Sequence, residues 1–304
     1  MLIALISDIH ANLPALEAVL SAVRRHHPDR ILSLGDQINL GPSPREVLSL
    51  LKENGVCCLH GNHERYVLSA LDGDAAYAGA NFGSVRWNAK RLRKEEISFP
   101  GTLELEGITF CHALPGDDRF PVFDPARALP LLRRRYTEGF THIVCGHGHN
   151  PTHYRMPHLR LDSIGAVGCM DDGVPGAAPY TMLESSGEDA VLRPYYAAFD
   201  VTRMPGLFRS SGLAEACPVM ARIACTQMMT GRDYLVEFVR RKPDLTGTGR
   251  RTDLPGNVAL CGRPLSVAGR ENHVRILVLT GVITCRRRTW RRPRRSRART
   301  SFHP

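Results

Sequence analysis

The sequence predicts a layered α/β fold, and three observations support this prediction. Short apolar runs alternate with segments in which apolar residues recur at helical spacing, as a sheet covered by helices requires. Up to Leu59 the order is strand, helix, strand, helix, strand, which is typical of a domain with parallel strands. Polar residues that bind metals follow the strand-like runs directly, and ligands of such folds bind at the carboxyl ends of the strands.

The N-terminal elements follow from local patterns. Leu2–Ile6 is a five-residue apolar run, typical of a strand that is buried on both faces. Asn12 is a favourable N-cap for the next helix, in which apolar residues recur at helical spacing as far as Val23. The same reasoning predicts a strand at Arg30–Leu34, a helix at Arg45–Glu53 and a strand at Val56–Leu59.

The later elements are less regular. Residues 64–96 have a mainly helical pattern with a Gly- and Ala-rich interruption at Asp72–Gly83. A short hairpin is expected at Leu103–Leu105 and Ile108–Cys111, then a helix at Ala126–Tyr136 and a strand at Thr141–Cys145. Further strands are expected at His153–Met156, Leu159–Ile164, Tyr180–Glu184 and Ala190–Tyr196. The sheet is expected to end near Phe199, and one or two helices are expected within residues 201–239.

The composition is that of a globular protein without disulfides or membrane segments. Hydrophobic residues make up 43% of the 304 residues and charged residues 23%. The nine cysteines lack the spacing of a disulfide framework, so we expect reduced thiols and a cytoplasmic protein. The apolar N-terminal run is too short for a signal peptide. Ile276–Thr284 has nine residues, whereas about 20 are needed to cross a bilayer, so no membrane partner is expected.

The net charge of +10 has a local origin. Nine arginines lie between residues 286 and 299, so the rest of the chain carries only +10 − 9 = +1. Such a run binds polyanions without sequence preference, or it is a solvated tail without a dedicated partner. Nucleic acid is therefore expected as a partner, if at all, only through residues 285–304.

Side chains that bind metals occur at the ends of five strand-like runs. In chain order these are Asp8 and His10, Asp36, Asn62 with His63 and Glu64, His112, and His147 with His149. Carboxylate, imidazole and amide ligands without thiolate suit Mn²⁺, Fe, Zn²⁺ or Ni²⁺ rather than a cysteine-based structural zinc site. One such cluster alone is compatible with an ordinary polar turn. Their recurrence at five strand ends favours a metal centre.

Together these motifs resemble the calcineurin-like metallophosphoesterase superfamily. The ordered signature is present as Asp8-Ile9-His10, Gly35-Asp36, Gly61-Asn62-His63-Glu64, a single His112 and Gly146-His147-Gly148-His149. The resemblance covers about residues 1–199. Gly41-Pro42, shortly after the second motif, is similar to the small bacterial phosphoesterases of this superfamily.

The resemblance implies an architecture. We expect a four-layer α/β/β/α sandwich of two mixed sheets flanked by helices. The metallophosphoesterase domain would cover residues 1–199 and a helical appendage residues 200–240. An Arg-rich, poorly structured extension would follow at residues 241–304.

The resemblance also implies a centre of two divalent metal ions. One ion would be held by Asp8, His10 and His149, the other by Asn62, His112 and His147, with Asp36 bridging them. The expected reaction is hydrolysis of a phosphomonoester or phosphodiester, for example a nucleotide, by hydroxide that bridges the ions. His63 would be the general acid in its imidazolium form, and Glu64 would cap the next helix or support the ligands.

One departure from the superfamily concerns the substrate. The arginines that grip phosphate in its protein Ser/Thr phosphatases are missing, which disfavours a phosphoprotein, although Arg65, Arg86 or Arg119 are available as substitutes. The expected partner is therefore a small-molecule phosphate ester. Specificity is expected to lie in the loops Pro42–Pro44, Asp72–Gly83 and Leu114–Pro125.

The alternative is a catalytically weak, metal-binding scaffold whose Arg-rich tail binds partners or nucleic acid. The presence of every ligand position together with His63 favours an enzyme, because a scaffold needs no general acid.

Overall fold

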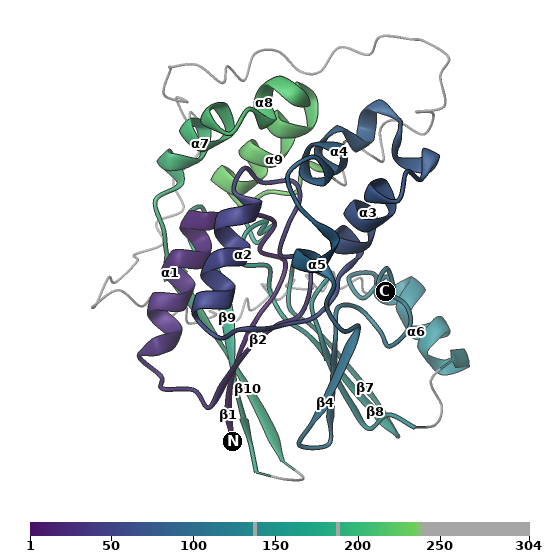
Figure 1. The fold of residues 1–304 in the computed structure, drawn as a ribbon. Coiled ribbons are helices and arrows are strands. Elements are labelled where there is room, and N and C mark those ends of the chain that lie inside the picture. Colours follow the sequence, from purple (N-terminus) through teal and green to yellow (C-terminus); the bar gives the residue numbers. More distant parts are fainter. Residues whose placement is uncertain (136–138, 187–188, 236–237, 239–304) are drawn as a thin grey trace, which may run out of the picture.

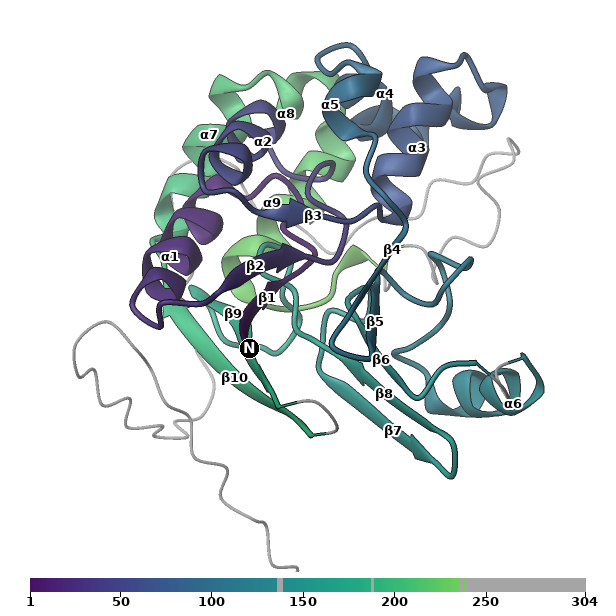
Figure 2. The ribbon, with the colours of Figure 1, turned by 60° about the horizontal axis from the view of Figure 1, so that its bottom comes forward.

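The protein is a sandwich of two sheets with helices on its outer faces. The computed structural model describes residues 1–135, 139–186, 189–235 and 238 of the chain. Within these ranges two five-stranded sheets face each other, as Figures 1 and 2 show. Helices cover the outer face of each sheet, so the predicted four-layer α/β/β/α architecture is confirmed.

The first sheet is built around the N-terminal strand. In spatial order it contains β10 (Ala190–Ala198), β9 (Ala177–Ser185), β1 (Leu2–Ile6), β2 (Arg30–Ser33) and β3 (Cys57–Cys58). Strand β1 is parallel to β2 and antiparallel to β9. Helices α1 (Leu13–Arg24) and α2 (Pro44–Glu53) supply apolar residues to the core on the outer face of this sheet. Asn12 caps α1 as expected, because its side chain accepts a hydrogen bond from the Ala15 N–H.

The second sheet has parallel strands at its centre and antiparallel strands at both edges. In spatial order it contains β4 (Thr102–Leu105), β5 (Ile108–Cys111), β6 (His142–Cys145), β8 (Leu159–Ser163) and β7 (Thr152–Met156). Strands β5, β6 and β8 are parallel, and the edge strands β4 and β7 are antiparallel to their neighbours. Helix α6 (Pro125–Arg135) covers the outer face of this sheet through a second apolar core.

The two sheets meet through a core made of alternate residues of their strands. Leu5 of the first sheet and Phe110 and Val144 of the second are fully buried members of this cluster. Because successive strand residues point to opposite faces, the neighbours of these residues pack against the outer helices instead. Both faces of the central strands are therefore apolar, which explains their continuous apolar sequence.

The remaining helices gather at the carboxyl ends of the parallel strands, at the top of Figure 1. They are α3 (Asn62–Leu71), α4 (Gly83–Ala89), α5 (Lys94–Ile97), α7 (Met204–Ser210), α8 (Leu213–Ala216) and α9 (Pro218–Thr230), with three-residue 3-10 turns at Ala75–Tyr77, Ala80–Phe82 and Val201–Arg203. The last three α-helices pack onto Leu40 and Trp87 of the first half of the chain. The segment after Phe199 is thus part of the core that surrounds the strand ends.

Several details differ from the expectations. The third strand is only Cys57–Cys58, because it pairs with β2 through two residue pairs before the chain turns away. Asn62 and His63 lie in the first turn of α3 rather than in a loop. Between Phe199 and residue 235 the structure has three α-helices, where one or two were expected within residues 201–239. The expected extension at 241–304, including the Arg-rich tail, lies outside the described residues.

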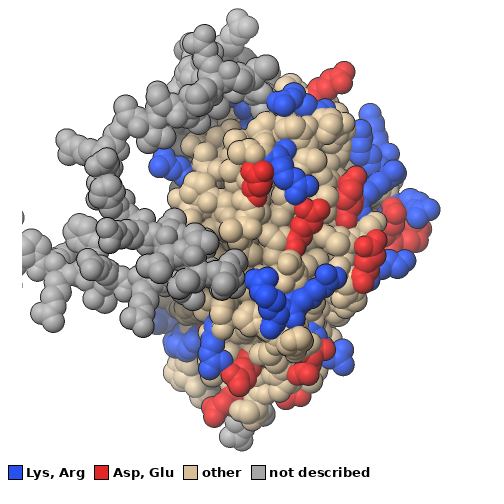
Figure 3. Space-filling model, turned by 90° about the vertical axis from the view of Figure 1, so that its left-hand side faces the viewer, with Lys and Arg blue, Asp and Glu red and all other residues tan. Residues whose placement is uncertain are grey.

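The described surface carries mixed charge. Figure 3 shows one face on which Lys and Arg side chains are interspersed with Asp and Glu. This agrees with the small net charge expected outside the tail. No helix within the described ranges is long and apolar enough to cross a membrane.

A buried carboxylate, Asp162, organises one edge of the second sheet. Its oxygens accept hydrogen bonds from Nε2 of His142 (2.9 Å), Nδ1 of His153 (2.7 Å), Nη1 of Arg155 (2.9 Å) and Nε of Arg160 (2.6 Å). Although burial alone would raise the pKa of Asp162, these hydrogen bonds and the charge of Arg160 hold it well below its usual range. The carboxylate is therefore ionised and joins three strands.

Candidate metal centre

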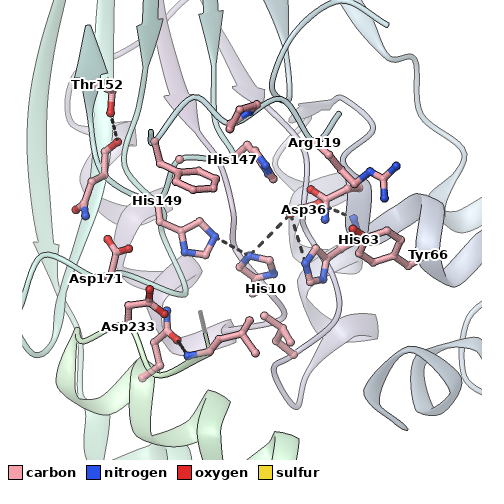
Figure 4. Close-up of a pocket in the computed structure, with 18 of the residues that line it drawn as sticks. His10, Asp36, His63, Tyr66, Arg119, His147, His149, Thr152, Asp171 and Asp233 are labelled. Carbon is pink, nitrogen blue, oxygen red and sulfur yellow. Dashed lines mark hydrogen bonds and ion pairs between the residues drawn. The ribbon is translucent and has the colours of Figure 1, made fainter. Parts of the chain in front are cut away.

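The loops that follow five strands bring the seven predicted metal ligands together. Asp8 and His10 follow β1, Asp36 follows β2, Asn62 opens α3 after β3, His112 follows β5, and His147 and His149 follow β6. All seven lie at the same edge of the sandwich because the strands that precede them are parallel within each sheet. Figure 4 shows five labelled residues of this region, His10, Asp36, His63, His147 and His149, around one pocket.

One group of ligand atoms forms around Asp36. Single ligand atoms of Asp36, His112 and His147 lie within 4.8 Å of one another. Oδ2 of Asp36 is 3.2 Å from Nε2 of His112, which in turn is 3.0 Å from Oδ1 of Asn62. The Nδ1–H of His112 donates to the Leu34 carbonyl at 2.8 Å, so its Nε2 faces the group. This second contact fixes the tautomer that a metal ligand needs.

A second group forms around Asp8. Single ligand atoms of Asp8, His10 and His149 also lie within 4.8 Å of one another. Oδ1 of Asp8 is 3.5 Å from Nε2 of His149 and 3.9 Å from Nε2 of His10, and the two ring nitrogens are 3.3 Å apart. Oδ1 of Asp8 is buried and accepts no hydrogen bond from any residue that the structure describes. A buried carboxylate oxygen with converging imidazoles fits a cation site.

Asp36 lies between the two groups. Its Oδ2 is 3.9 Å from Nε2 of His10 and belongs to a third compact group with His10 and His63. Although burial alone would raise the pKa of Asp36, the neighbouring His112 and His63 hold it well below its usual range. Burial opposes protonation of His112, but the Asp36 charge raises its pKa to about 10. The carboxylate therefore creates a potential that favours positive charge in the site.

The backbone at the ligands is unusual. Five of the seven residues adopt positive φ angles, namely Asp8 (53°), His10 (48°), Asp36 (56°), His147 (62°) and His149 (55°). Non-glycine residues in this region are uncommon, although Asp and His tolerate it better than most, and they cluster at functional sites. The left-handed turns allow residues two apart in sequence, such as His147 and His149, to point into one site.

The glycines of the motifs make room for the ligands. A Cβ atom on Gly61 would lie 2.2 Å from Oδ1 of Asp36, and one on Gly146 would lie 2.7 Å from Oδ2 of Asp8. No side chain fits at these distances. Gly61 is therefore required by the close approach of the Asp36 carboxylate, and Gly146 by that of the Ser7 hydroxyl and the Asp8 carboxylate.

Glu64 holds the Asp36 loop in place. Its carboxylate accepts backbone N–H bonds from Asp36, Gln37 and Gly61 at 2.9 Å and from Ile38 at 3.3 Å. Burial and the charge of Asp36 raise the pKa of Glu64, whereas the backbone donors of Gly61 and Asp36 act in the opposite direction. Both expected roles are met, because Glu64 caps α3 and also supports a ligand.

His63 faces the same pocket without belonging to the two main groups. Its Nε2 is 3.9 Å from Oδ2 of Asp36, and its Nδ1 accepts a 2.8 Å hydrogen bond from the Asn39 side-chain amide. The Asn39 oxygen accepts from Asn88 Nδ2 at 3.4 Å, which orients the Asn39 amide. Burial lowers the pKa of His63. The arrangement favours a neutral imidazole with its proton on Nε2 over the expected imidazolium.

The centre opens into a cavity of about 490 Å³. Arg119, Phe123 and Arg127 line it, as do Asp171 and three residues from the C-terminal helical region, Gln227, Asp233 and Leu235. Of the three expected specificity loops, Leu114–Pro125 contributes lining residues, whereas Pro42–Pro44 and Asp72–Gly83 contribute none among the described residues. The sequence did not predict that Gln227, Asp233 and Leu235 line the pocket. A helical pattern shows where a helix forms but not which loops it packs against.

The three arginines considered as substitutes for phosphate-binding arginines differ in their contacts. Nε of Arg65 donates to Asp118 at 2.6 Å, and Nη1 of Arg86 donates to the Tyr77 carbonyl at 2.7 Å. Arg119 alone of the three lines the pocket.

Comparisons with known proteins agree with this geometry. The family model for calcineurin-like phosphoesterases matches residues 1–174. An uncharacterized protein of Methanocaldococcus jannaschii is 32% identical over 124 residues, which are 38% of this chain and 50% of that protein. The match therefore spans about half the length of that curated relative.

Two solved structures share the fold. A metallophosphoesterase from Sphaerobacter thermophilus is 25% identical, with a TM-score of 0.55, and the match covers 74% of this chain and 100% of that one. A hypothetical protein from Pyrococcus horikoshii OT3 is 15% identical, with a TM-score of 0.58, and the match covers 76% of this chain and 98% of that one. The second similarity concerns the fold only.

Proposed function

The chain belongs to the calcineurin-like phosphoesterase family, and from this premise we propose that it hydrolyses phosphomonoesters or phosphodiesters with two divalent metal ions. One ion would be held by Asp8, His10 and His149, and the other by Asn62, His112 and His147, with Asp36 between them. The observation that carries this proposal is the convergence of two adjacent three-residue groups of oxygen and nitrogen ligands in one pocket. The absence of thiolate among the proposed ligands supports Mn²⁺, Fe, Zn²⁺ or Ni²⁺.

The proposed roles of the residues follow from their chemistry. When bound, two such ions polarise phosphoryl oxygens and lower the pKa of water, which supplies a nucleophile near neutral pH. With its Nδ1 occupied by the Asn39 amide, the neutral ring of His63 would donate a hydrogen bond from Nε2–H to the leaving oxygen and stabilise the charge that develops there. Glu64 would keep Asp36 in position, because its carboxylate accepts hydrogen bonds from four backbone N–H groups.

A chromogenic assay tests the proposal. Hydrolysis of p-nitrophenyl phosphate and of bis(p-nitrophenyl) phosphate is measured with Mn²⁺ or with chelator, on the wild type and on Asp36→Asn. Turnover should require Mn²⁺ and should fall about 100-fold or more in the variant, because the bridging charge is lost. Asp74→Asn is the matched control, since Asp74 is an exposed N-cap where Asn serves equally well.

Two results would contradict the proposal. Full activity in Asp36→Asn would refute the assigned site. A protein that binds metal but turns over neither ester would favour the scaffold function instead.

A further inference from the structure

The walls of the pocket differ in charge. Arg119 and Arg127 line the pocket, and so do Asp171 and Asp233. Figure 4 shows Arg119 beside His63 and Tyr66, whereas Asp171 and Asp233 lie beyond His149 on the other side. A pocket with opposite charges on its two sides orients a charged ligand.

Within the part of the chain that the structure describes, the side chains of Arg119 and Arg127 have no protein acceptor. Among the described residues, neither guanidinium makes a hydrogen bond or a salt bridge, although Arg65 nearby is paired with Asp118. An arginine side chain offers several donors in a planar fork that matches carboxylate and phosphate oxygens. Unpaired arginines that line a cavity therefore indicate an anionic group on the ligand.

The position of Arg119 indicates which part of the ligand is anionic. The ring of Tyr66 is 5.4 Å from that of His63 between centroids. Burial raises the pKa of Tyr66, and the nearby charges of Arg65 and then Arg119 act in the opposite direction. Arg119, Tyr66 and His63 thus form one side of the pocket. If the Nε2–H of His63 faces the leaving oxygen, the group that departs with this oxygen lies against Tyr66 and Arg119.

We propose that the preferred substrates are phosphate esters whose leaving group carries its own negative charge, and that Arg119 selects them by binding that charge. This inference rests on the proposed function, because it takes His63 as the neighbour of the leaving oxygen. Arg127 strengthens the positive field, and the carboxylates of Asp171 and Asp233 repel the anionic group from the opposite side. Arg119 is a specificity residue for the leaving group, distinct from the groups proposed to hold the metals.

Non-hydrolysable probes test this without relying on turnover. The binding of benzylphosphonate, 4-carboxybenzylphosphonate and 4-(aminomethyl)benzylphosphonate to the full-length, Mn²⁺-loaded protein is measured by calorimetry. The three probes share the phosphonate and the ring and differ in the para substituent at the leaving-group end, which is hydrogen, an anionic carboxylate or a cationic ammonium group. The variants are Arg119→Gln and, as a control, Arg133→Gln, which removes an exposed arginine of α6 that does not line the pocket.

The wild type and Arg133→Gln should bind the carboxylate probe about tenfold or more tightly than benzylphosphonate, and the ammonium probe should bind most weakly. In Arg119→Gln the carboxylate preference should fall to about twofold or less. Equal affinity of the wild type for all probes, or no binding of any, would overturn the inference. Equal weakening of all probes in Arg119→Gln would also overturn it, because Arg119 would then bind the phosphonate itself.

Failure of this inference and failure of the proposed function give different results. A carboxylate preference that depends on Arg119 supports the charge selection even if neither chromogenic ester is hydrolysed, in which case only the proposed function falls. Metal-dependent turnover without any charge preference would leave the proposed function in place and refute the selection.

Discussion

The side-chain amide of Asn39 donates a 2.8 Å hydrogen bond to Nδ1 of His63, and this contact decides which ring nitrogen faces the pocket. Nδ1 must be the acceptor, so the proton of the neutral ring is on Nε2. Sequence alone did not point to Asn39. Asn39 matters only because the loop after β2 places it beside His63 in the first turn of α3.

Asn39→Ala should lower kcat about tenfold, because the ring loses its orientation and its fixed tautomer. The metal content should not change, since Asn39 is not among the proposed ligands. Steady-state kinetics and metal analysis of the purified variant check both points. Asn54→Ala, which alters an exposed contact with Arg24 instead, is the control. A loss of metal together with activity would show that Asn39 acts on the centre itself.

Glu64→Gln should destabilise the protein and displace Asp36. The carboxylate of Glu64 accepts hydrogen bonds from backbone N–H groups, for example those of Asp36 and Gly61. In the variant the side-chain amide nitrogen, itself a donor, would face some of these donors. We expect a loss of about 2 to 3 kcal/mol in the free energy of unfolding, measured by urea denaturation. Glu46→Gln on the exposed side of α2 should cost less than about 0.5 kcal/mol. Equal stability of the two variants would contradict this role of Glu64.

Gly61→Ala should abolish metal binding even though alanine is the smallest possible change. The new methyl group would lie 2.2 Å from Oδ1 and 2.5 Å from the backbone N of Asp36, so the carboxylate must move. Overpacking of this kind costs about 1 to 3 kcal/mol. Gly101→Ala is the matched control, because its Cβ would meet nothing within 4 Å. Calorimetric titration with Mn²⁺ should show binding in the control and none in Gly61→Ala.

Asp162→Asn should destabilise the second sheet in a pH-dependent way. The variant leaves several donors without their ionised acceptor, and we expect a cost of about 3 kcal/mol at pH 7. This cost is at the lower end of the range for breaking a buried ion pair, because the partners His153 and Arg155 are themselves 56% and 53% exposed. Asp72→Asn, which breaks an exposed pair with Lys94, should cost less than about 1 kcal/mol.

The sign of the pH dependence follows from the lowered pKa of Asp162. A carboxyl group whose pKa is lower in the folded state stabilises the protein above its unfolded pKa of about 3.9, and loses this effect as the pH falls through the folded value. The stability gap between wild type and Asp162→Asn should therefore stay constant from pH 8 to 5 and narrow only below about pH 4. A gap that closes near pH 6 would contradict this assignment.

The sequence predicted the parts of the site that depend on local pattern. The apolar runs located nearly every strand, and the motifs at their ends identified residues such as Asp36 and His147 that the fold brings together. The sequence could not show contacts between distant segments. Asn39 reaches His63, and Gln227 reaches the pocket, only because loops and helices far apart in the chain pack together. The third strand was expected to be longer, because its apolar pattern does not show where pairing with β2 stops.

The candidate ligands come from both halves of the sandwich, and this has a thermodynamic consequence. Asp8 follows a strand of the first sheet and His147 a strand of the second, and the two are joined directly by a 2.9 Å bond from the His147 N–H to Oδ2 of Asp8. Ions held by such a set of residues would cross-link the sheets. Metal affinity and the docking of the sheets are then reciprocally linked. Trimming Phe110 or Val144 in the core between the sheets would weaken ion binding without touching a ligand, and metal release would loosen the sandwich.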